Sequence, residues 1–207
     1  MTKGLSLILC TFLTAICTAN AYIDDHPLQG YKEAQGNFLN KVTYSSNGEN
    51  HVVMQTESGY FKSTPDPQYP ENICMNNEIH VYDFGENSKV PPVLKWKLYD
   101  FVHDCETSAR LEFSKDSPMV TDLDGDGRKE VWISYYKGCH GDVSPDELKV
   151  FMYRDGVKHS IRGQTHVFVD GNFYGGDFKM DQAMKSSDRR FQDFGVNLFR
   201  RLAEDKH

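Results

Sequence analysis

Residues 121–136 have the sequence TDLDGDGRKEVWISYY. In the first ten residues, three carboxylates alternate with other residues, at Asp122, Asp124 and Asp126. The two glycines of this segment have no side chain to restrict the backbone, so they allow a sharp turn that brings the carboxylates together. The last six residues are mostly β-branched or aromatic, which favours an extended strand. The stretch therefore predicts an acidic loop that leads directly into a β-strand.

The acidic loop has the oxygen groups of a calcium site. Calcium takes six to eight oxygen ligands at about 2.3–2.6 Å. The expected ligands are the side chains of Asp122, Asp124 and Asp126, the carbonyl of Arg128, the carboxylate of Glu130, and water. Four acidic side chains in so short a segment repel one another unless a cation neutralises them. We expect one Ca²⁺ ion rather than Mg²⁺, which prefers a near-ideal octahedron; the alternative is a metal-free Asp/Gly turn.

The spacing of the acids indicates which kind of calcium loop this is. A helix-loop-helix site needs an acid twelve places from the first ligand, and here that place is Ile133, inside the predicted strand. The closing acid is instead Glu130, at the ninth place. In this the loop resembles the integrin-type (FG-GAP) calcium loop of β-propeller repeats, Asp-x-Asp-x-Asp-Gly-x-x-Asp/Glu, which joins two strands. The chain has this loop once, so we expect the loop without a full propeller.

Short alternating segments on both sides of the loop predict a mainly β fold. Residues 93–101 alternate apolar and polar side chains, as a half-buried strand does. Asn47-Gly48 and Asp155-Gly156 are hairpin turn signals. The other expected strands are 41–44, 51–54, 78–83, 109–113, 119–123, 130–136, 148–153, 158–161 and 166–169. Residues 63–76 contain three prolines and predict a loop. We expect antiparallel sheets in a meander, sandwich-like or partly propeller-like.

The C-terminal segment has a different period and predicts a helix. In residues 187–203, large apolar side chains recur every three or four positions, which is typical of an amphipathic helix. Ser186 or Ser187 is the expected N-cap. Gly195 weakens this helix by about 1 kcal/mol relative to alanine. The helix is expected to cover one face of a sheet; the alternative is a surface for self-association.

The N-terminus has the order of features of a secretory signal peptide. Lys3 is followed by an apolar run over residues 5–17, which is too short to span a bilayer, and then by Ala19-Asn20-Ala21. We therefore expect residues 1–21 to be cleaved and residues 22–207 to form a single domain. The product would be exported, either periplasmic or secreted. The alternative is a buried N-terminal helix.

The charge of the chain excludes two classes of partner. Lys and Arg number 23 against 30 Asp and Glu, so the formal net charge is −7. A basic surface for binding nucleic acid is therefore not expected, nor is a polybasic membrane anchor. No segment outside the N-terminus approaches the length of a membrane span, so an integral membrane protein is not expected.

Three cysteines remain after the signal peptide, and in an oxidising compartment two of them are expected to pair. Three pairings are open on the sequence alone. We favour Cys105 with Cys139, because both flank strand-like segments, and this bond would stabilise the fold by about 3–4 kcal/mol. Cys74 would then be a buried free thiol or a dimer link. A competing hypothesis is a zinc site made from His103, Asp104, Cys105, Cys139 and His140.

A second motif follows the loop, and the two together resemble a known family. Residues 139–145 read CHGDVSP, and Leu148-Lys149 and Arg162-Gly163 follow. With the DLDGDG loop, these features resemble an uncharacterised family of exported bacterial proteins, some labelled with surface polysaccharide biosynthesis. The resemblance covers residues 121–165. It implies an exported protein with a link to the cell envelope, and it implies no mechanism.

Catalytic signatures are sparse. The sequence lacks Gly-x-Ser-x-Gly, His-Glu-x-x-His and a glycine-rich phosphate loop. His140 with Asp142 is the best acid–base pair, although Asp142 is a better candidate for capping the following turn. A strand starting at Glu130 would place His140 roughly 30 Å from it, so the two are not expected to share a site.

The sequence therefore predicts an exported, calcium-binding, non-enzymatic envelope domain whose partner is surface polysaccharide or another envelope component. Exposed aromatics could form a sugar platform, and the candidates are Tyr135, Tyr136 and Tyr174; the alternative is strand packing. A glycan-acting hydrolase or accessory enzyme is the second hypothesis. A structural envelope protein that self-associates through its helix is the third.

Overall fold

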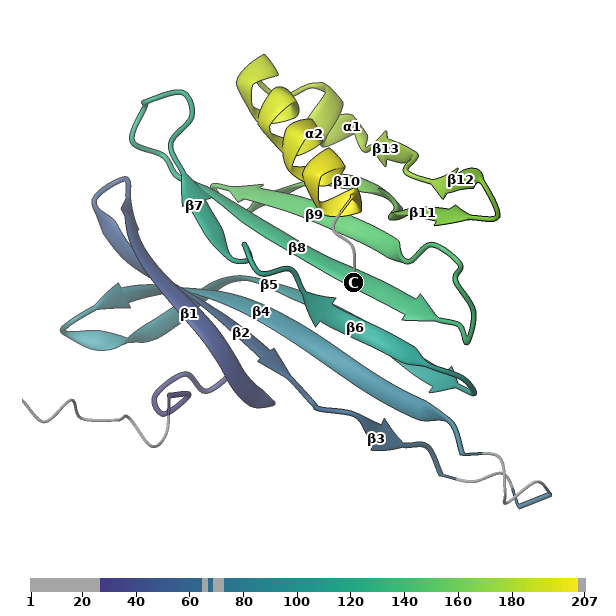
Figure 1. The fold of residues 1–207 in the computed structure, drawn as a ribbon. Helices are drawn as coiled ribbons and strands as arrows, with labels where there is room; N and C mark the ends of the chain where they lie inside the picture. The colour runs from purple at the N-terminus through teal and green to yellow at the C-terminus, as the bar shows by residue number, and fades with distance from the viewer. Residues whose placement is uncertain (1–26, 65–66, 69–72, 205–207) are drawn as a thin grey trace, which may run out of the picture.

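The computed structural model describes residues 27–64, 67–68 and 73–204. The predicted signal peptide, residues 1–21, and the expected mature N-terminus at Tyr22 lie outside the described residues. Within the described part the fold is mainly β, with two antiparallel sheets and a C-terminal helix, as expected. Figure 1 shows the two sheets one above the other, with the helix on the outer face of the second sheet.

The first sheet comes from the N-terminal half of the chain. Its strands are β1 (Asn37–Ser46), β2 (Glu49–Glu57), β3 (Phe61–Lys62), β4 (Met75–Asn87) and β5 (Val90–Cys105). Strand β4 is central and pairs antiparallel with β2, β3 and β5. The predicted Asn47-Gly48 turn joins β1 to β2, and both residues have positive φ, 51° and 75°. Asn and Gly tolerate this left-handed backbone better than other residues, so this dipeptide sets the hairpin.

The second sheet comes from the middle of the chain. Its strands are β6 (Ala109–Phe113), β7 (Met119–Thr121), β8 (Glu130–Cys139), β9 (Glu147–Arg154), β10 (Val157–Gln164) and β13 (Phe178–Met180). The order is β13-β10-β9-β8-β6, and β7 also pairs with β8. The predicted Asp155-Gly156 turn joins β9 to β10. The remaining strands, β11 (His166–Val169) and β12 (Asn172–Gly175), form a separate hairpin.

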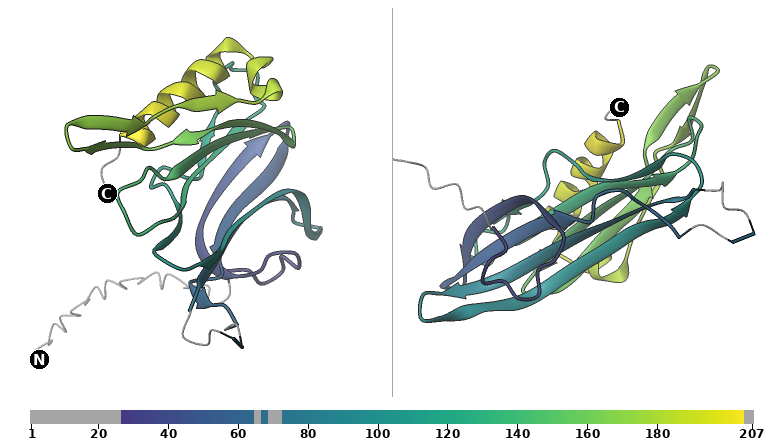
Figure 2. Two further views of the ribbon diagram at one scale, coloured as in Figure 1. Left: turned by 90° about the vertical axis from the view of Figure 1, so that its right-hand side faces the viewer. Right: turned by 90° about the horizontal axis from the view of Figure 1, so that it is seen from below.

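The two sheets face each other across a hydrophobic core. Strand β8 contributes Val131, Ile133 and Tyr135 to this core, and it contributes Trp132 and Tyr136 to a second core on its other face. Side chains of a strand alternate between faces, so β8 must be apolar on both sides to serve two cores. Figure 2 shows the resulting layers: the first sheet, the second sheet and the helices.

The helices close the second core. They are α1 (Gln182–Lys185) and α2 (Arg189–Ala203). The expected N-cap at Ser186 or Ser187 was wrong: Asp188 caps α2, and its side chain accepts a hydrogen bond from the backbone N–H of Arg190. Ser187 instead donates its hydroxyl to the carbonyl of Met184 at the end of α1. A second short helix therefore occupies the residues before Asp188, and α2 begins two residues later than expected.

The apolar side of α2 packs on the chain's own sheet. Phe191, Leu198, Phe199 and Leu202 are all buried in the second core. This side of the helix is therefore not available as the self-association surface that the third hypothesis requires. Among the described residues, no helix is both long enough and apolar enough to cross a bilayer.

Gly195 allows α2 to lie close to the sheet. A Cβ atom at this position would lie 2.8 Å from Ile161 Cδ1 and 3.0 Å from Trp132 Cζ3, both of which belong to buried side chains. We predict that Gly195→Ala lowers the free energy of unfolding, because overpacking costs about 1–3 kcal/mol and the gain in helix propensity is about 1 kcal/mol. Urea unfolding measures the difference. Asn197→Gly compared with Asn197→Ala, at an exposed site of α2, is the control for propensity. A more stable Gly195→Ala variant would contradict the packing argument.

Several short elements were not expected from the sequence. The hairpin partner β12, the edge strand β13, the two-residue strand β3 and helix α1 have too few residues to show a period. The predicted loop over 63–76 is correct for its described residues up to Cys74, but β4 already begins at Met75. The expected strands 41–44 and 51–54 extend to ten and nine residues in β1 and β2.

Candidate functional site

The acidic loop lies between β7 and β8, which pair antiparallel, with Thr121 opposite Glu130. This pairing holds the two ends of the loop side by side. Gly125 and Gly127 have φ of 73° and 84°, a left-handed backbone that residues with a Cβ rarely adopt. These two positions reverse the chain direction within the loop, as the sequence predicts.

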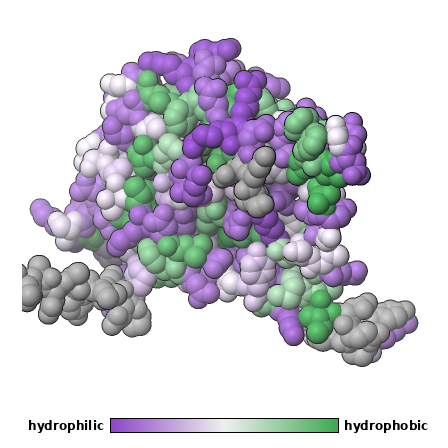
Figure 3. All heavy atoms as spheres, in the orientation of Figure 1, coloured by the Kyte–Doolittle hydropathy of each residue, from purple (hydrophilic) through white to green (hydrophobic). Residues whose placement is uncertain are grey.

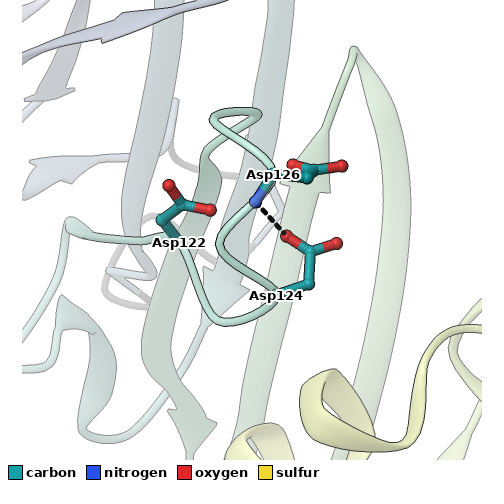
Figure 4. A group of neighbouring side chains, drawn as sticks. All are labelled: Asp122, Asp124 and Asp126. Atoms are coloured by element: carbon teal, nitrogen blue, oxygen red, sulfur yellow. Dashed lines mark hydrogen bonds between the residues drawn. The ribbon is translucent and has the colours of Figure 1, made fainter.

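The side chains of Asp122, Asp124 and Asp126 converge in this turn (Figure 4). One carboxylate oxygen from each lies within 4.8 Å of the other two. Oxygens that surround a single Ca²⁺ at 2.3–2.6 Å are separated by at most about 5 Å, so the three fit around one ion. Two backbone N–H groups orient them: Asp126 donates to Asp124 Oδ1 at 3.3 Å, and Gly127 donates to Asp122 Oδ1 at 3.4 Å. This aspartate triad can hold a metal ion.

Basic side chains also contact the aspartate triad. Lys129 Nζ lies 2.8 Å from Asp122 Oδ2, and Arg128 Nη2 lies 2.6 Å from Asp126 Oδ2. The hydrogen bond from Lys129 lowers the pKa of Asp122, and hydrogen bonds from the Arg128 side chain and backbone lower the pKa of Asp126. The carboxylates of Asp122 and Asp126 therefore stay ionised near neutral pH, which is the form that binds a cation.

Arg154, at the end of β9, is the residue of this site that the sequence did not indicate. Its Nη2 lies 2.8 Å from Asp124 Oδ2 and 2.6 Å from Asp126 Oδ2. No local pattern could have revealed it, because its place is set by the pairing of β9 with β8. A metal ion at the aspartate triad would share these oxygens with Arg154 or replace it.

Glu130 is fully buried at the base of the loop, with an exposed fraction of 0%. Its Oε2 accepts hydrogen bonds from Thr121 Oγ1 at 2.8 Å and from the N–H of Leu123 at 3.0 Å. Its Oε1 has no hydrogen-bond donor within the described structure and lies 3.5 Å from Arg154 Nε. Burial raises the pKa of Glu130. The carboxylate thus closes the loop with one oxygen and leaves the other unbonded.

Three of the five predicted ligand residues lie together in the structure. These are Asp122, Asp124 and Asp126. The ligand roles of Glu130 and of the Arg128 carbonyl stay predictions. The side chain of Arg128 points to other groups, since it contacts Asp126 and lies 3.3 Å from Asp155.

The cysteines are arranged as expected. Cys105 and Cys139 form a disulfide, and Cys74 is a partly buried free cysteine. The competing zinc site is therefore wrong, because both thiolates that it needs are bonded to each other. His103 lies 3.0 Å from Glu78, an ordinary ion-pair distance, rather than against His140.

For Asp142, the structure favours the turn-capping alternative over an acid–base pair with His140. His140 Nε2 lies 2.9 Å from Asp146 Oδ1, whereas its Nδ1 lies 3.8 Å from Asp142 Oδ1. Asp142 accepts a hydrogen bond from the N–H of Ser144 at 3.0 Å. It therefore caps the turn before Pro145, which was the alternative role predicted for it. Strand β8 runs from Glu130 to Cys139, so His140 and the acidic loop lie at its opposite ends, as expected.

Two of the three proposed sugar-platform aromatics are not at the surface. Tyr135 and Tyr136 are 1% and 2% exposed and pack in the two cores, so the strand-packing alternative is correct for them. Tyr174 is 51% exposed in β12, where Phe168 and Phe173 of the same hairpin are also exposed. Figure 3 shows a mostly hydrophilic face in which hydrophobic side chains gather over this hairpin.

Comparison of the chain with protein-family models, with curated proteins and with solved structures finds no match. The protein is therefore described by its fold and its site alone. It is a two-sheet β domain with a disulfide, a C-terminal helix and an aspartate triad that could hold a metal ion.

Proposed function

We propose that this chain is an exported, calcium-binding, non-enzymatic domain of the cell envelope, in which one Ca²⁺ ion fixes the acidic loop. The observation that carries the proposal is the convergence of the three aspartate carboxylates within 4.8 Å. All the proposed side-chain ligands are oxygens, which suits a hard cation such as calcium.

The contacts of the loop support a structural role for the ion. The backbone N–H of Lys129 donates to Ser46 Oγ at the end of β1, at 3.1 Å. Arg190 of α2 donates to the carbonyl of Asp124 at 3.3 Å. The loop therefore contacts the first sheet, its own sheet and the helix, so an ion that orders the loop would stabilise three parts of the fold.

The disulfide supports export, because disulfides persist in oxidising compartments and are rare in the cytosol. The signal-peptide features of residues 1–21 agree with this. Residues 121–165 resemble a family of exported bacterial proteins, some of them labelled with surface polysaccharide biosynthesis, and this supports an envelope component as the partner.

Calcium removal tests the proposal. We predict that EDTA lowers the melting temperature and that added Ca²⁺ restores it, because a ligand at about 100 times its Kd stabilises the folded state by about 2.7 kcal/mol. For a domain of this size, that corresponds to roughly 5–10 °C. Differential scanning calorimetry in EDTA and in excess Ca²⁺ measures the shift.

Asp124→Asn removes one ligand charge while keeping the side-chain shape, so it should abolish most of the calcium-dependent shift. Asp170→Asn is the matched control, since Asp170 is also followed by glycine in an exposed turn, between β11 and β12. The calcium-dependent rise in melting temperature of Asp170→Asn should equal that of the unchanged protein. A melting temperature that does not respond to Ca²⁺, together with no heat of binding in titration calorimetry, would exclude a calcium domain.

A further inference from the structure

A cavity of about 250 Å³ lies beside the acidic loop, at the end of the molecule where the β1–β2 turn meets the second sheet. Its walls include Tyr44, His51, Asp83, Trp96, Lys129 and Asp155. These residues come from both sheets and from the two turns next to the loop (Figure 1). The cavity is small, below the range of about 300–1,000 Å³ typical of drug-sized ligands.

A buried carboxylate orients a histidine in this cavity. Asp83 is 1% exposed, and its Oδ2 lies 3.1 Å from His51 Nδ1. The Tyr44 hydroxyl donates to Asp83 Oδ1 at 3.3 Å, and the Tyr44 ring stacks on His51 with centroids 4.7 Å apart. Asp83 thus fixes the ring of His51 through Nδ1, which directs Nε2 to the other side. There Nε2 lies 3.7 Å from Glu49 Oε2, too far for a direct hydrogen bond.

The charges around the cavity are already paired. Lys95 Nζ lies 2.7 Å from Glu49, and Lys129 Nζ lies 2.8 Å from Asp122. Asp155 is contacted by Arg128 at 3.3 Å. An anionic or cationic ligand would have to compete with these existing partners. A neutral ligand with hydroxyl groups can both donate and accept, so it can bond to the paired groups without separating them.

Largely buried aromatic rings complete the wall of the cavity. Trp96 and Tyr153 stack across the two sheets with ring centroids 3.8 Å apart, and both line the cavity with Tyr44. Aromatic carbon next to hydrogen-bonding groups matches a molecule that has both C–H faces and hydroxyls.

We propose that this cavity binds one residue of a neutral sugar, with one sugar hydroxyl donating to His51 Nε2 and a neighbouring hydroxyl donating to the Glu49 carboxylate. The inference deepens the proposed envelope function, because it names the ligand class and the place where it binds. The acidic loop forms one wall through Lys129, so the sugar site and the calcium site are neighbours with separate ligands.

Imidazole NMR signals of His51 in the full chain report binding directly. The neutral probes are D-glucose, D-galactose and N-acetyl-D-glucosamine, and the charged probes are acetate and choline, each titrated in excess Ca²⁺. We expect at least one neutral sugar to shift the His51 signals in a saturable way, and neither charged probe to do so. Failure of all three sugars, or saturation by acetate or choline instead, would overturn the assignment.

Two glutamine variants make the test specific. Glu49→Gln should weaken sugar affinity by about tenfold, because it removes a charged acceptor. Glu147→Gln is the matched control: the two glutamates are 45% and 43% exposed, and each lies beside a lysine on a strand. The sugar affinity of Glu147→Gln should equal that of the unchanged protein. If the two variants bind the sugar equally well, Glu49 does not contact it. Calcium binding measured on the same samples separates failure of the sugar site from failure of the proposed calcium function.

Discussion

The protein without its disulfide is expected to be less stable by about 3–4 kcal/mol, because the bond closes a long segment of chain. Cys105 ends β5 in the first sheet, and Cys139 ends β8 in the second, with a sequence separation of 34. The bond therefore joins the two sheets at one end. It restricts the unfolded chain, including the segment that carries the acidic loop.

The double variant Cys105→Ala with Cys139→Ala tests this in guanidinium unfolding. Cys74→Ala is the control, since Cys74 is partly buried and unpaired with another cysteine, and it should change the free energy of unfolding by less than about 1 kcal/mol. Reduction of the unchanged protein should reproduce the loss seen in the double variant. A loss below about 1 kcal/mol in the double variant would show that the bond contributes little beyond packing.

Local sequence signals were sufficient where the structure depends on local chemistry. Asn47-Gly48 and Asp155-Gly156 form the turns that they predict, because these residues adopt positive φ at low cost. The alternation in residues 93–101 places Trp96 and Leu98 in the core and Lys97 and Tyr99 outside. The carboxylates of the acidic loop likewise converge because the three aspartates and the glycines are close together in sequence.

The sequence was insufficient where a residue depends on strand register. Arg154 reaches the aspartate triad, and Asp83 reaches His51, only because β9 pairs with β8 and β4 pairs with β2. The expectation that Tyr136 is exposed was wrong for a related reason. Strand β8 is covered on both faces, so its continuous apolar run does not show which side chains would meet solvent. Helix α2 began later than expected because Ser187 bonds back to α1, which is too short to predict.

Strand register also places Asp100 between the two sheets, and we expect the second large loss of stability when its charge is removed. Asp100 on β5 faces the second sheet, where it accepts hydrogen bonds from Tyr135 Oη at 2.6 Å, from Lys137 Nζ at 3.0 Å and from Lys149 Nζ. Its side chain is only 13% exposed. Asp100→Asn should lower the free energy of unfolding by about 3 kcal/mol at neutral pH, because losing one partner of a largely buried ion pair leaves the other uncompensated.

The same contact predicts how stability depends on pH. Burial acts to raise the pKa of Asp100, but hydrogen bonds from Lys149, Tyr135 and Lys137 outweigh it and lower the pKa to about 2. In the unfolded chain the pKa of an aspartate is about 3.9. The folded state therefore binds the proton less readily than the unfolded state does. The resulting stability, about 2.6 kcal/mol, is present above about pH 4 and is lost as the pH falls towards 2.

Urea unfolding of the unchanged protein and of Asp100→Asn at pH 7 and near pH 2 separates this contribution from that of other acids. The difference between the two proteins should be large at pH 7 and should shrink near pH 2, because the carboxyl of Asp100 is then protonated in the unfolded state and about half protonated in the folded state. Asp193→Asn is the control: its exposed pair with Arg189 on α2 is worth less than about 0.5 kcal/mol. A difference that stays constant with pH would mean that Asp100 acts through shape and packing, and that its charge does not hold the two sheets together.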